Sequence, residues 1–180
     1  MIENELSYLI KRMPDLAGIP GKDIEQHYLS ESEEPLRIRR SGGTYELTKK
    51  LNVAGDDLSR REEITVPLDR EEFYLLLGLS KRGLTKTRHY LRLDGTLTAE
   101  LDIFHGQLEG LAMVEVEFPN EETRSAFVPP RWFGRDVSQE EWSSNSSLAG
   151  KSFASVKRHL EPKKAPSRRP APNTKKRPSS

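Results

Sequence analysis

The sequence predicts an α+β protein that is mainly β, with an antiparallel sheet and a few short helices. Three observations lead to this prediction. About eight segments alternate apolar and polar residues with the period of a strand. They follow one another through hairpin turns, and no helical pattern is long enough for the crossovers that parallel strands need. The 180 residues favour one main domain. These patterns leave open whether the sheet is open or closed.

The first half of the chain is expected to hold five strands and one helix. Gly42-Gly43, between two alternating runs, predicts a hairpin turn. Asp69 is a suitable N-cap for a helix, and Glu72 three residues later completes a capping box. The expected strands are 2–9, 24–30, 36–40, 45–51 and 61–68, and the expected helix is 70–77.

The second half is expected to hold three more strands and three short helices. Asp94-Gly95 predicts the turn of a second hairpin. Pro129 and Pro130 end one short helix, and Ser138 with Glu141 predicts the start of another. The expected strands are 84–93, 96–104 and 113–118, and the expected helices are 121–127, 138–148 and 151–159.

The end of the chain differs in composition from the rest. Residues 161–180 hold seven basic residues, one acidic residue and five prolines, a net charge of +6, whereas the preceding 160 residues carry −5. Without apolar periodicity this tail cannot offset its ordering entropy, so we expect a folded domain at 1–160 and a disordered tail at 161–180. The tail is either a solubilising segment, which we favour, or a contact for polyanions such as RNA or polyphosphate.

Composition excludes several classes of protein. The chain has no cysteine, which excludes a disulfide scaffold, a thiolate zinc site and a cysteine nucleophile. No apolar run approaches the roughly 20 residues that span a bilayer. The N-terminus carries acids where a signal peptide carries basic residues. We therefore expect a cytoplasmic protein with no transmembrane segment.

The polar faces of the predicted strands carry an organised charge pattern. Residues two apart in a strand share a face, and many such pairs here have charges, with basic and acidic pairs on different strands. A solvated outer face would explain any one pair. The basic pairs are Arg37/Arg39 and Lys86/Arg88, and the acidic pairs are Glu3/Glu5, Glu100/Asp102 and Glu115/Glu117. If the sheet closes with these faces inward, it encloses a tunnel that can hold a divalent cation and phosphates.

These motifs together resemble the CYTH family, also called triphosphate tunnel metalloenzymes, from Met1 to about Ala149. Glu3-Asn4-Glu5 resembles the paired glutamates of the family's first strand, and Arg37-Ile38-Arg39 its Arg-x-Arg strand. Further matches are Leu47-Thr48-Lys49, Arg61-Glu62-Glu63, Lys86-Thr87-Arg88, Glu100-Leu101-Asp102-Ile103-Phe104 and Val114-Glu115-Val116-Glu117-Phe118. Each motif is weak by itself, and their order and spacing are specific.

The resemblance implies a fold, a substrate class and a metal. The fold would be an eight-stranded antiparallel closed barrel around a charged tunnel. The substrate would be a linear triphosphate: inorganic tripolyphosphate first, or a nucleoside or thiamine triphosphate. The cofactor would be Mg²⁺ or Mn²⁺, in keeping with oxygen-only ligands.

The resemblance also implies a role for each matching residue. Glu5, Glu117 and Lys86 would be catalytic. Metal-binding carboxylates would be Glu3, Glu5, Glu115 and Glu117. Phosphate-binding cations would be Arg37, Arg39, Lys49, Lys86 and Arg88. Supporting carboxylates would be Glu63, Glu100 and Asp102.

Two departures from the family pattern keep other functions open. Ser7 stands where the family has a lysine, and Thr65 where it has the second glutamate of Arg-x-Glu-x-Glu. Metal-dependent triphosphate hydrolysis is the first hypothesis. The alternatives are ATP cyclisation, as in class IV adenylate cyclases, and a non-catalytic module that binds triphosphate or polyphosphate.

Overall fold

The computed structural model describes residues 2–32, 34–52, 59–93 and 95–161, without the side chains of Ile2, Glu3 and Arg60. Of the predicted tail, everything after Glu161 lies outside the described residues, as does Asp94 of the second predicted turn. Disorder of the tail therefore stays a prediction.

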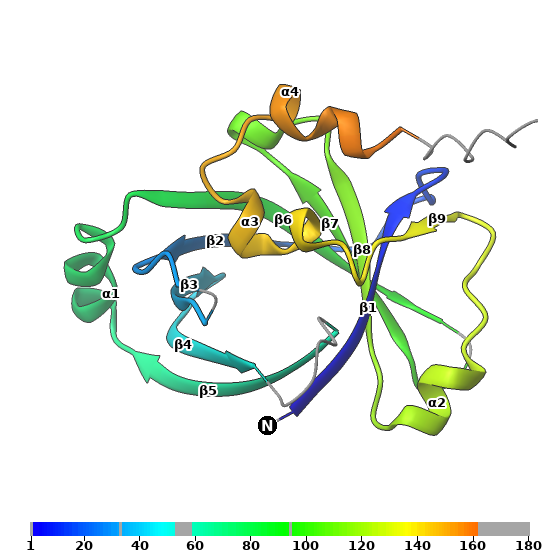
Figure 1. Ribbon diagram of the computed structural model, residues 1–180, viewed down its shortest axis with the longest axis horizontal. Helices are drawn as coiled ribbons and strands as arrows, with labels where there is room; N and C mark the ends of the chain where they lie inside the picture. The colour runs from blue at the N-terminus through cyan, green and yellow to red at the C-terminus, as the bar shows by residue number, and fades with distance from the viewer. Residues whose placement is uncertain (1, 33, 53–58, 94, 162–180) are drawn as a thin grey trace, which may run out of the picture.

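Nine strands and a set of short helices make up the described chain (Figure 1). The strands are β1 (Ile2–Ile10), β2 (Gly21–Tyr28), β3 (Leu36–Ser41), β4 (Thr44–Asn52), β5 (Arg60–Leu68), β6 (Arg82–Arg92), β7 (Thr98–Phe104), β8 (Ala112–Glu117) and β9 (Phe133–Asp136). The α-helices are α1 (Arg70–Leu77), α2 (Glu121–Ala126), α3 (Asn145–Leu148) and α4 (Phe153–Val156). The 3₁₀ helices are η1 (Gly106–Leu108), η2 (Glu141–Ser143) and η3 (Lys157–His159).

All strands belong to one antiparallel sheet, which confirms the mainly β prediction. The order is β5-β4-β3-β2-β6-β7-β8-β1-β9, with a further pairing of β5 with β1. Residues 2–4 of β1 pair with β5, and residues 5–9 pair with β8. The described chain has one strand more than the eight expected. The extra strand, β9, has only four residues, too few for alternation to reveal it.

The local signals for the first hairpin turn and for the first helix cap are confirmed. Gly42 and Gly43 join β3 to β4, with Ser41 paired to Thr44, and Gly42 has the left-handed φ of 60°. Asp69 caps α1: its Oδ1 accepts a hydrogen bond from the Glu72 amide at 2.8 Å, and Glu72 Oε2 accepts one from the Asp69 amide at 2.8 Å. This is the capping box that the sequence predicted.

The predicted helix over 138–148 is wrong. The Ser138 hydroxyl accepts a hydrogen bond from the Ser7 amide of β1 at 2.9 Å and also contacts Asp136, so it anchors this segment to the sheet. The chain instead passes through η2 and then α3, which Ser144 caps. A capping box is a local signal, and here the long-range bond to β1 takes the hydroxyl that would have capped the helix.

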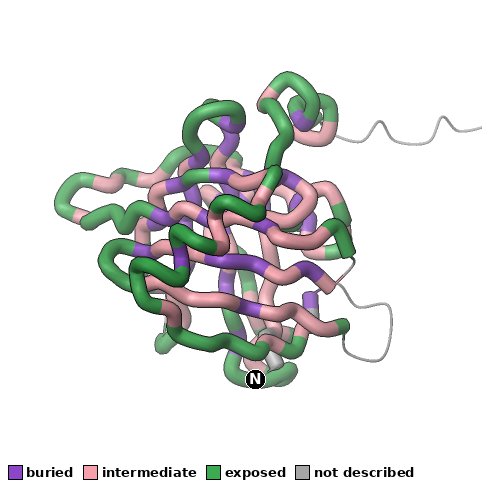
Figure 2. Tube along the Cα trace, turned by 90° about the vertical axis from the view of Figure 1, so that its left-hand side faces the viewer, coloured by how far each residue is buried: buried purple, intermediate pink, exposed green. Residues whose placement is uncertain are grey.

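Buried and part-exposed residues alternate along the strands, as Figure 2 shows. One core cluster includes Val114, Val116 and Phe133, and is formed by residues of β1, β7, β8 and β9. A second includes Leu84, Phe104 and Leu148, and joins the sheet to the C-terminal helices. Among the described residues, no helix has the length and apolar character to span a membrane.

Candidate active site

A charged cavity of about 60 Å³ lies on the face of the sheet opposite the cluster that includes Val114 and Val116. Seven of the strands and α3 each contribute at least one side chain to it. Its lining is almost wholly polar and consists of Glu5, Gln26, Arg37, Arg39, Lys50, Lys86, Arg88, Glu100, Glu115, Glu117 and Asn145. The structure therefore brings together eight of the predicted site residues.

The register of the β3–β4 hairpin decides which lysine of β4 enters this cavity. Arg37 is paired with Thr48 and Arg39 with Glu46, and cross-strand partners share a face of the sheet. Lys50 has the same parity as Thr48 and lines the cavity. Lys49 has the other parity, and its Nζ donates to the Glu34 carbonyl at 2.5 Å. The structure thus places Lys50, not the predicted Lys49, at the site.

Arg37 and Arg39 lie on the same face of β3, and each has a hydrogen-bond donor unused among the described residues. Arg37 is 5% exposed, and its Nη2 donates to Thr48 Oγ1 at 3.2 Å. The Nη2 of Arg39 pairs with Glu46 at 2.6 Å. In both residues Nε is buried and has no hydrogen-bond partner in the described part of the chain. An unpartnered buried donor is costly, so both guanidinium groups are suited to an anionic ligand.

Lys86 is a fully buried cation held between two elements. Its Nζ donates to Asp102 Oδ2 at 2.5 Å and to Asn145 Oδ1 at 3.0 Å. Burial lowers the pKa of Lys86, against the opposing effect of the Asp102 charge. Burial by itself would raise the pKa of Asp102, but the neighbouring charges of Lys86 and Arg88 outweigh it and lower that pKa. Asp102 is therefore the counterion that keeps Lys86 and Arg88 in place.

Arg88 lies among three carboxylates. It makes a bidentate pair with Asp102, contacts Glu115 Oε2 at 2.7 Å and also pairs with Glu100. Burial raises the pKa of Glu100, with a smaller contribution from Glu115, while Arg88 opposes the shift. This arrangement arises because basic β6 is the direct neighbour of acidic β7 in the sheet.

The acidic wall of the cavity comes from β1 and β8. Glu5 and Glu117 are directly opposite in register, so their side chains are about 5 Å apart at Cβ. Glu63 lies beside this site rather than in its lining and pairs with Lys50 at 2.5 Å. Glu3 also lies on β1, opposite Arg61, but its side chain is outside the described part of the chain.

The donors of this wall fit a hard divalent cation. No three His, Cys, Asp or Glu side chains form a preassembled metal cluster among those that the structure describes. Mg²⁺, however, commonly takes only one or two protein carboxylates, with water and substrate phosphate as its other ligands. The adjacent carboxylates of Glu5 and Glu117 meet that requirement.

Four cavity or wall residues were missed from the sequence. Glu46 and Lys50 could have been found from the two-residue turn at 42–43, because such a turn fixes the register of the hairpin. This register pairs Glu46 with Arg39 and places Lys50 on the same face. Gln26, which donates to the Tyr28 hydroxyl at 2.9 Å, is an uncharged residue and so falls outside the charge pattern. Asn145 reaches the cavity only because α3 folds back to Lys86.

The two departures from the family pattern lie at or near the site. Thr65 shares a face with Glu63, and its hydroxyl lies 3.1 Å from that of Thr48. Ser7 is paired with Glu115 across β1 and β8. Neither side chain carries a charge.

Comparison with known proteins identifies relatives along most of the chain. Residues 22–128 match the CYTH domain. An inorganic triphosphatase of Nitrosomonas europaea is 35% identical over 154 residues, which cover 83% of this chain and 97% of the relative. An inorganic triphosphatase of Acetivibrio thermocellus is 30% identical over 128 residues, which cover 71% of this chain and 79% of the relative.

Solved structures agree with these matches. The crystal structure of an inorganic triphosphatase superposes with a TM-score of 0.61 at 31% identity, and covers 81% of this chain and 93% of that one. A Bacillus halodurans structure described as a candidate adenylate cyclase has a TM-score of 0.53 at 17% identity, with 89% and 98% covered, and shows a shared fold alone. The domain match and the near full-length relative establish that the chain belongs to the CYTH domain family.

Proposed function

We propose that this protein hydrolyses a linear triphosphate, with inorganic tripolyphosphate as the first candidate substrate, in the charged cavity. The observation that carries the proposal is the pair of guanidinium groups of Arg37 and Arg39, in each of which Nε is buried. Their Nε donors have no partner in the described chain, and carboxylates lie on the facing strands. Both relatives above bear the name inorganic triphosphatase, which supports the same substrate.

Strands β1 to β8 are inferred to form a closed eight-stranded barrel with this cavity as its tunnel. The inference is supported by the pairing of β1, which contacts β5 through residues 2–4 and β8 through residues 5–9. A closed ring would explain why strands distant in sequence line one cavity. β9 would then lie outside the ring, against β1.

The phosphate chain would lie along the basic side of the tunnel. Arg37, Arg39, Lys86 and Arg88 keep their predicted roles in this proposal, and Lys50 takes the place of Lys49. Arginine forks hold phosphate oxygens through two donors, and lysine acts as a point charge. Asp102, Glu100 and Glu63 would position these cations through the ion pairs described above.

Glu5 and Glu117, with Glu3 and Glu115, would hold Mg²⁺ or Mn²⁺ on the acidic side. When bound, the cation would neutralise charge on the phosphate oxygens and lower the pKa of a bound water. Glu5 and Glu117 would also orient a water toward the terminal phosphorus, and one of the two carboxylates would take up its proton. The terminal P–O bond of the chain would break, and phosphate and pyrophosphate would leave. Lys86 would stabilise charge on the departing bridging oxygen.

The decisive experiment measures phosphate release from tripolyphosphate, ATP and thiamine triphosphate with Mg²⁺, with Mn²⁺ and with EDTA. Glu5→Gln is the test variant and removes a proposed metal ligand while keeping the size of the side chain. Glu31→Gln, on an exposed residue away from the cavity, is the matched control. We expect metal-dependent release in the wild type and the control, and a loss of about a hundredfold or more in Glu5→Gln. A fully active Glu5→Gln would contradict the assignment.

A module that binds triphosphate without turnover is the second candidate, favoured by the uncharged Ser7 and Thr65. It predicts tripolyphosphate binding in the same assay with no phosphate release under any metal. Restoring the family residues in a Ser7→Lys, Thr65→Glu double variant should then produce turnover. ATP consumption without phosphate release would point instead to cyclisation.

A further inference from the structure

A second, larger pocket of about 310 Å³ lies at the beginning of β6. β7 pairs with β6 only from Lys86 onward, so the preceding residues have an open edge. Two other segments attach there: the His105 amide bonds the Thr85 carbonyl at 3.0 Å, and the Gly150 amide bonds the Gly83 carbonyl at 3.1 Å. We call the space between them the β6-edge pocket. It shares no lining residue with the charged cavity.

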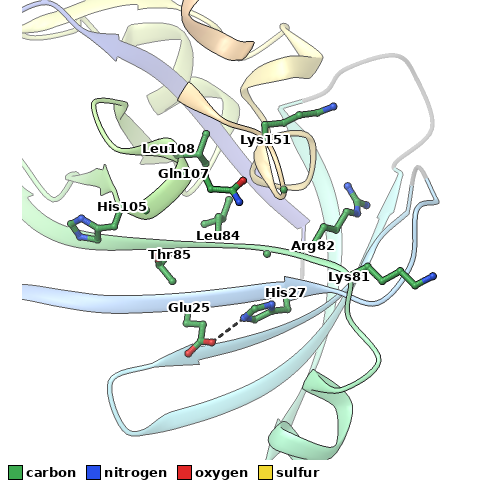
Figure 3. A pocket seen from close by; sticks show the side chains of 13 residues that line it. Glu25, His27, Lys81, Arg82, Leu84, Thr85, His105, Gln107, Leu108 and Lys151 are labelled. Atoms are coloured by element: carbon green, nitrogen blue, oxygen red, sulfur yellow. Dashed lines mark hydrogen bonds and ion pairs between the residues drawn. The ribbon is translucent and has the colours of Figure 1, made fainter. Parts of the chain in front are cut away.

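The lining of the β6-edge pocket is basic. Lys81, Arg82 and Lys151 are its basic residues besides histidine, and Glu25 is the carboxylate among the described residues that line it. Glu25 is already paired with His27 at 2.9 Å and with Arg40 at 2.7 Å, so its charge is compensated. Figure 3 shows Glu25 and His27 on one side of β6 and Lys151 on the other. The charge favours an anionic ligand.

The pocket also has an apolar part. Leu84 and Leu108 line it although they are 6% and 2% exposed, and Figure 3 shows the Gln107 side chain beside them. Its volume is within the range of small-molecule sites, about 300–1,000 Å³. Basic residues and buried leucines in one lining suit a phosphate group attached to a ring of about the size of a nucleoside.

A short chain of hydrogen bonds joins the β6-edge pocket to the charged cavity. Arg82 lines the pocket, and its Nη1 donates to the Ser146 carbonyl of α3 at 2.7 Å. The preceding residue, Asn145, accepts a hydrogen bond from Lys86 in the cavity at 3.0 Å. Gly150, which bonds to Gly83 at the pocket, follows the same helix. A ligand that displaces Arg82, or the segment from α3 to Gly150, therefore alters the surroundings of Lys86.

We propose that the β6-edge pocket binds a small organic phosphate and that its occupancy changes substrate handling in the charged cavity. The binding part of this proposal does not depend on the reaction proposed above. Only the effect on the charged cavity rests on the proposed function, because it assumes that this cavity binds a triphosphate.

The test uses the full chain and AMP as the probe, with inorganic phosphate as a second probe, and measures binding by calorimetry. Lys81→Ala/Lys151→Ala removes two exposed cations of the pocket. Lys11→Ala/Lys157→Ala removes two exposed cations elsewhere and is the matched control for net charge. We expect the pocket variant to weaken AMP binding by about tenfold or more, and the control variant to leave it unchanged. AMP should bind more tightly than inorganic phosphate.

Several results would overturn the proposal. No AMP binding at about 1 mM would overturn the site, since a mononucleotide site of this kind should be occupied there. If Arg37→Ala/Arg39→Ala loses AMP binding while the pocket variant binds AMP as tightly as the wild type, the anion binds in the charged cavity. Equal affinity for inorganic phosphate would overturn the organic ligand class.

The link to the cavity has its own readout. AMP should change the affinity for tripolyphosphate by about twofold or more in the wild type, and not in Lys81→Ala/Lys151→Ala. Calorimetry measures this effect even if the chain proves to have no triphosphatase activity. An unchanged tripolyphosphate affinity with AMP bound would overturn the link and leave the binding site standing.

Discussion

Arg88 and Asp102 meet through two parallel hydrogen bonds, from Nε to Oδ1 at 2.7 Å and from Nη2 to Oδ2 at 2.6 Å. Asp102 also accepts from Lys86, and its side chain is 2% exposed. One buried carboxylate on β7 therefore orients both Lys86 and Arg88 of β6. Fixed in this way, the two cations would need little reorganisation to bind the phosphate of the proposed substrate.

Replacing this counterion should destabilise the fold. Asp102→Asn leaves Lys86 and Arg88 buried beside a neutral amide, and removing one partner of a buried pair costs about 3–5 kcal/mol. Urea unfolding near neutral pH measures the loss. Glu121→Gln is the control, because Glu121 is exposed and its pair with Arg124 should contribute little. An Asp102→Asn protein as stable as the wild type would show that Glu100 and Glu115 suffice as counterions.

The two adjacent lysines of β4 should differ sharply in function. Lys50→Ala removes a cation from the charged cavity and should raise the KM for tripolyphosphate by about tenfold or more. Lys49→Ala removes a cation bonded to a backbone carbonyl outside it and should leave KM nearly unchanged. Steady-state phosphate release from both variants measures the difference. The opposite ranking would mean that the register of β3 with β4 is not the one described.

Gly83 should be intolerant of a side chain. A Cβ there would lie 2.6 Å from Cε1 of His27 and 2.9 Å from the carbonyl oxygen of Gln26. We expect Gly83→Ala to lower the free energy of unfolding by about 1–3 kcal/mol. His27→Ala in the same chain should recover part of this loss, since it removes the ring but not the backbone contact. A double-mutant cycle by thermal unfolding tests the coupling, and strict additivity would contradict it.

Tyr8 should make stability depend on pH in the alkaline range. Burial, with the Asp136 charge, raises the pKa of Tyr8 from 10.0 to about 12. The folded state therefore favours the protonated phenol, and this contribution is complete below pH 10 and is lost as pH rises from there to about 12. Denaturant unfolding across this range should show the wild type losing stability relative to Tyr8→Phe. Parallel curves for the two proteins would refute the prediction.

Much of the fold follows from short-range chemistry. The alternation of apolar and polar residues located the eight long strands, and the Gly42-Gly43 turn and the Asp69–Glu72 box located a hairpin and a helix start. These signals succeed because the atoms that form them are within a few residues of one another. The Ser138 prediction failed for the converse reason: its hydroxyl is used by an amide 131 residues away.

The sequence by itself determined which residue types could make a charged site, because period-two spacing puts Arg37 with Arg39, Lys86 with Arg88 and Glu115 with Glu117. Only the tertiary structure decided which of them meet. Strand order places basic β6 beside acidic β7. The register of the β3–β4 hairpin places Lys50 in the charged cavity and Lys49 on the other face of the sheet. The return of the C-terminal segment adds Asn145. Alternation is a property of one strand, whereas a shared cavity depends on pairings between strands far apart in the chain.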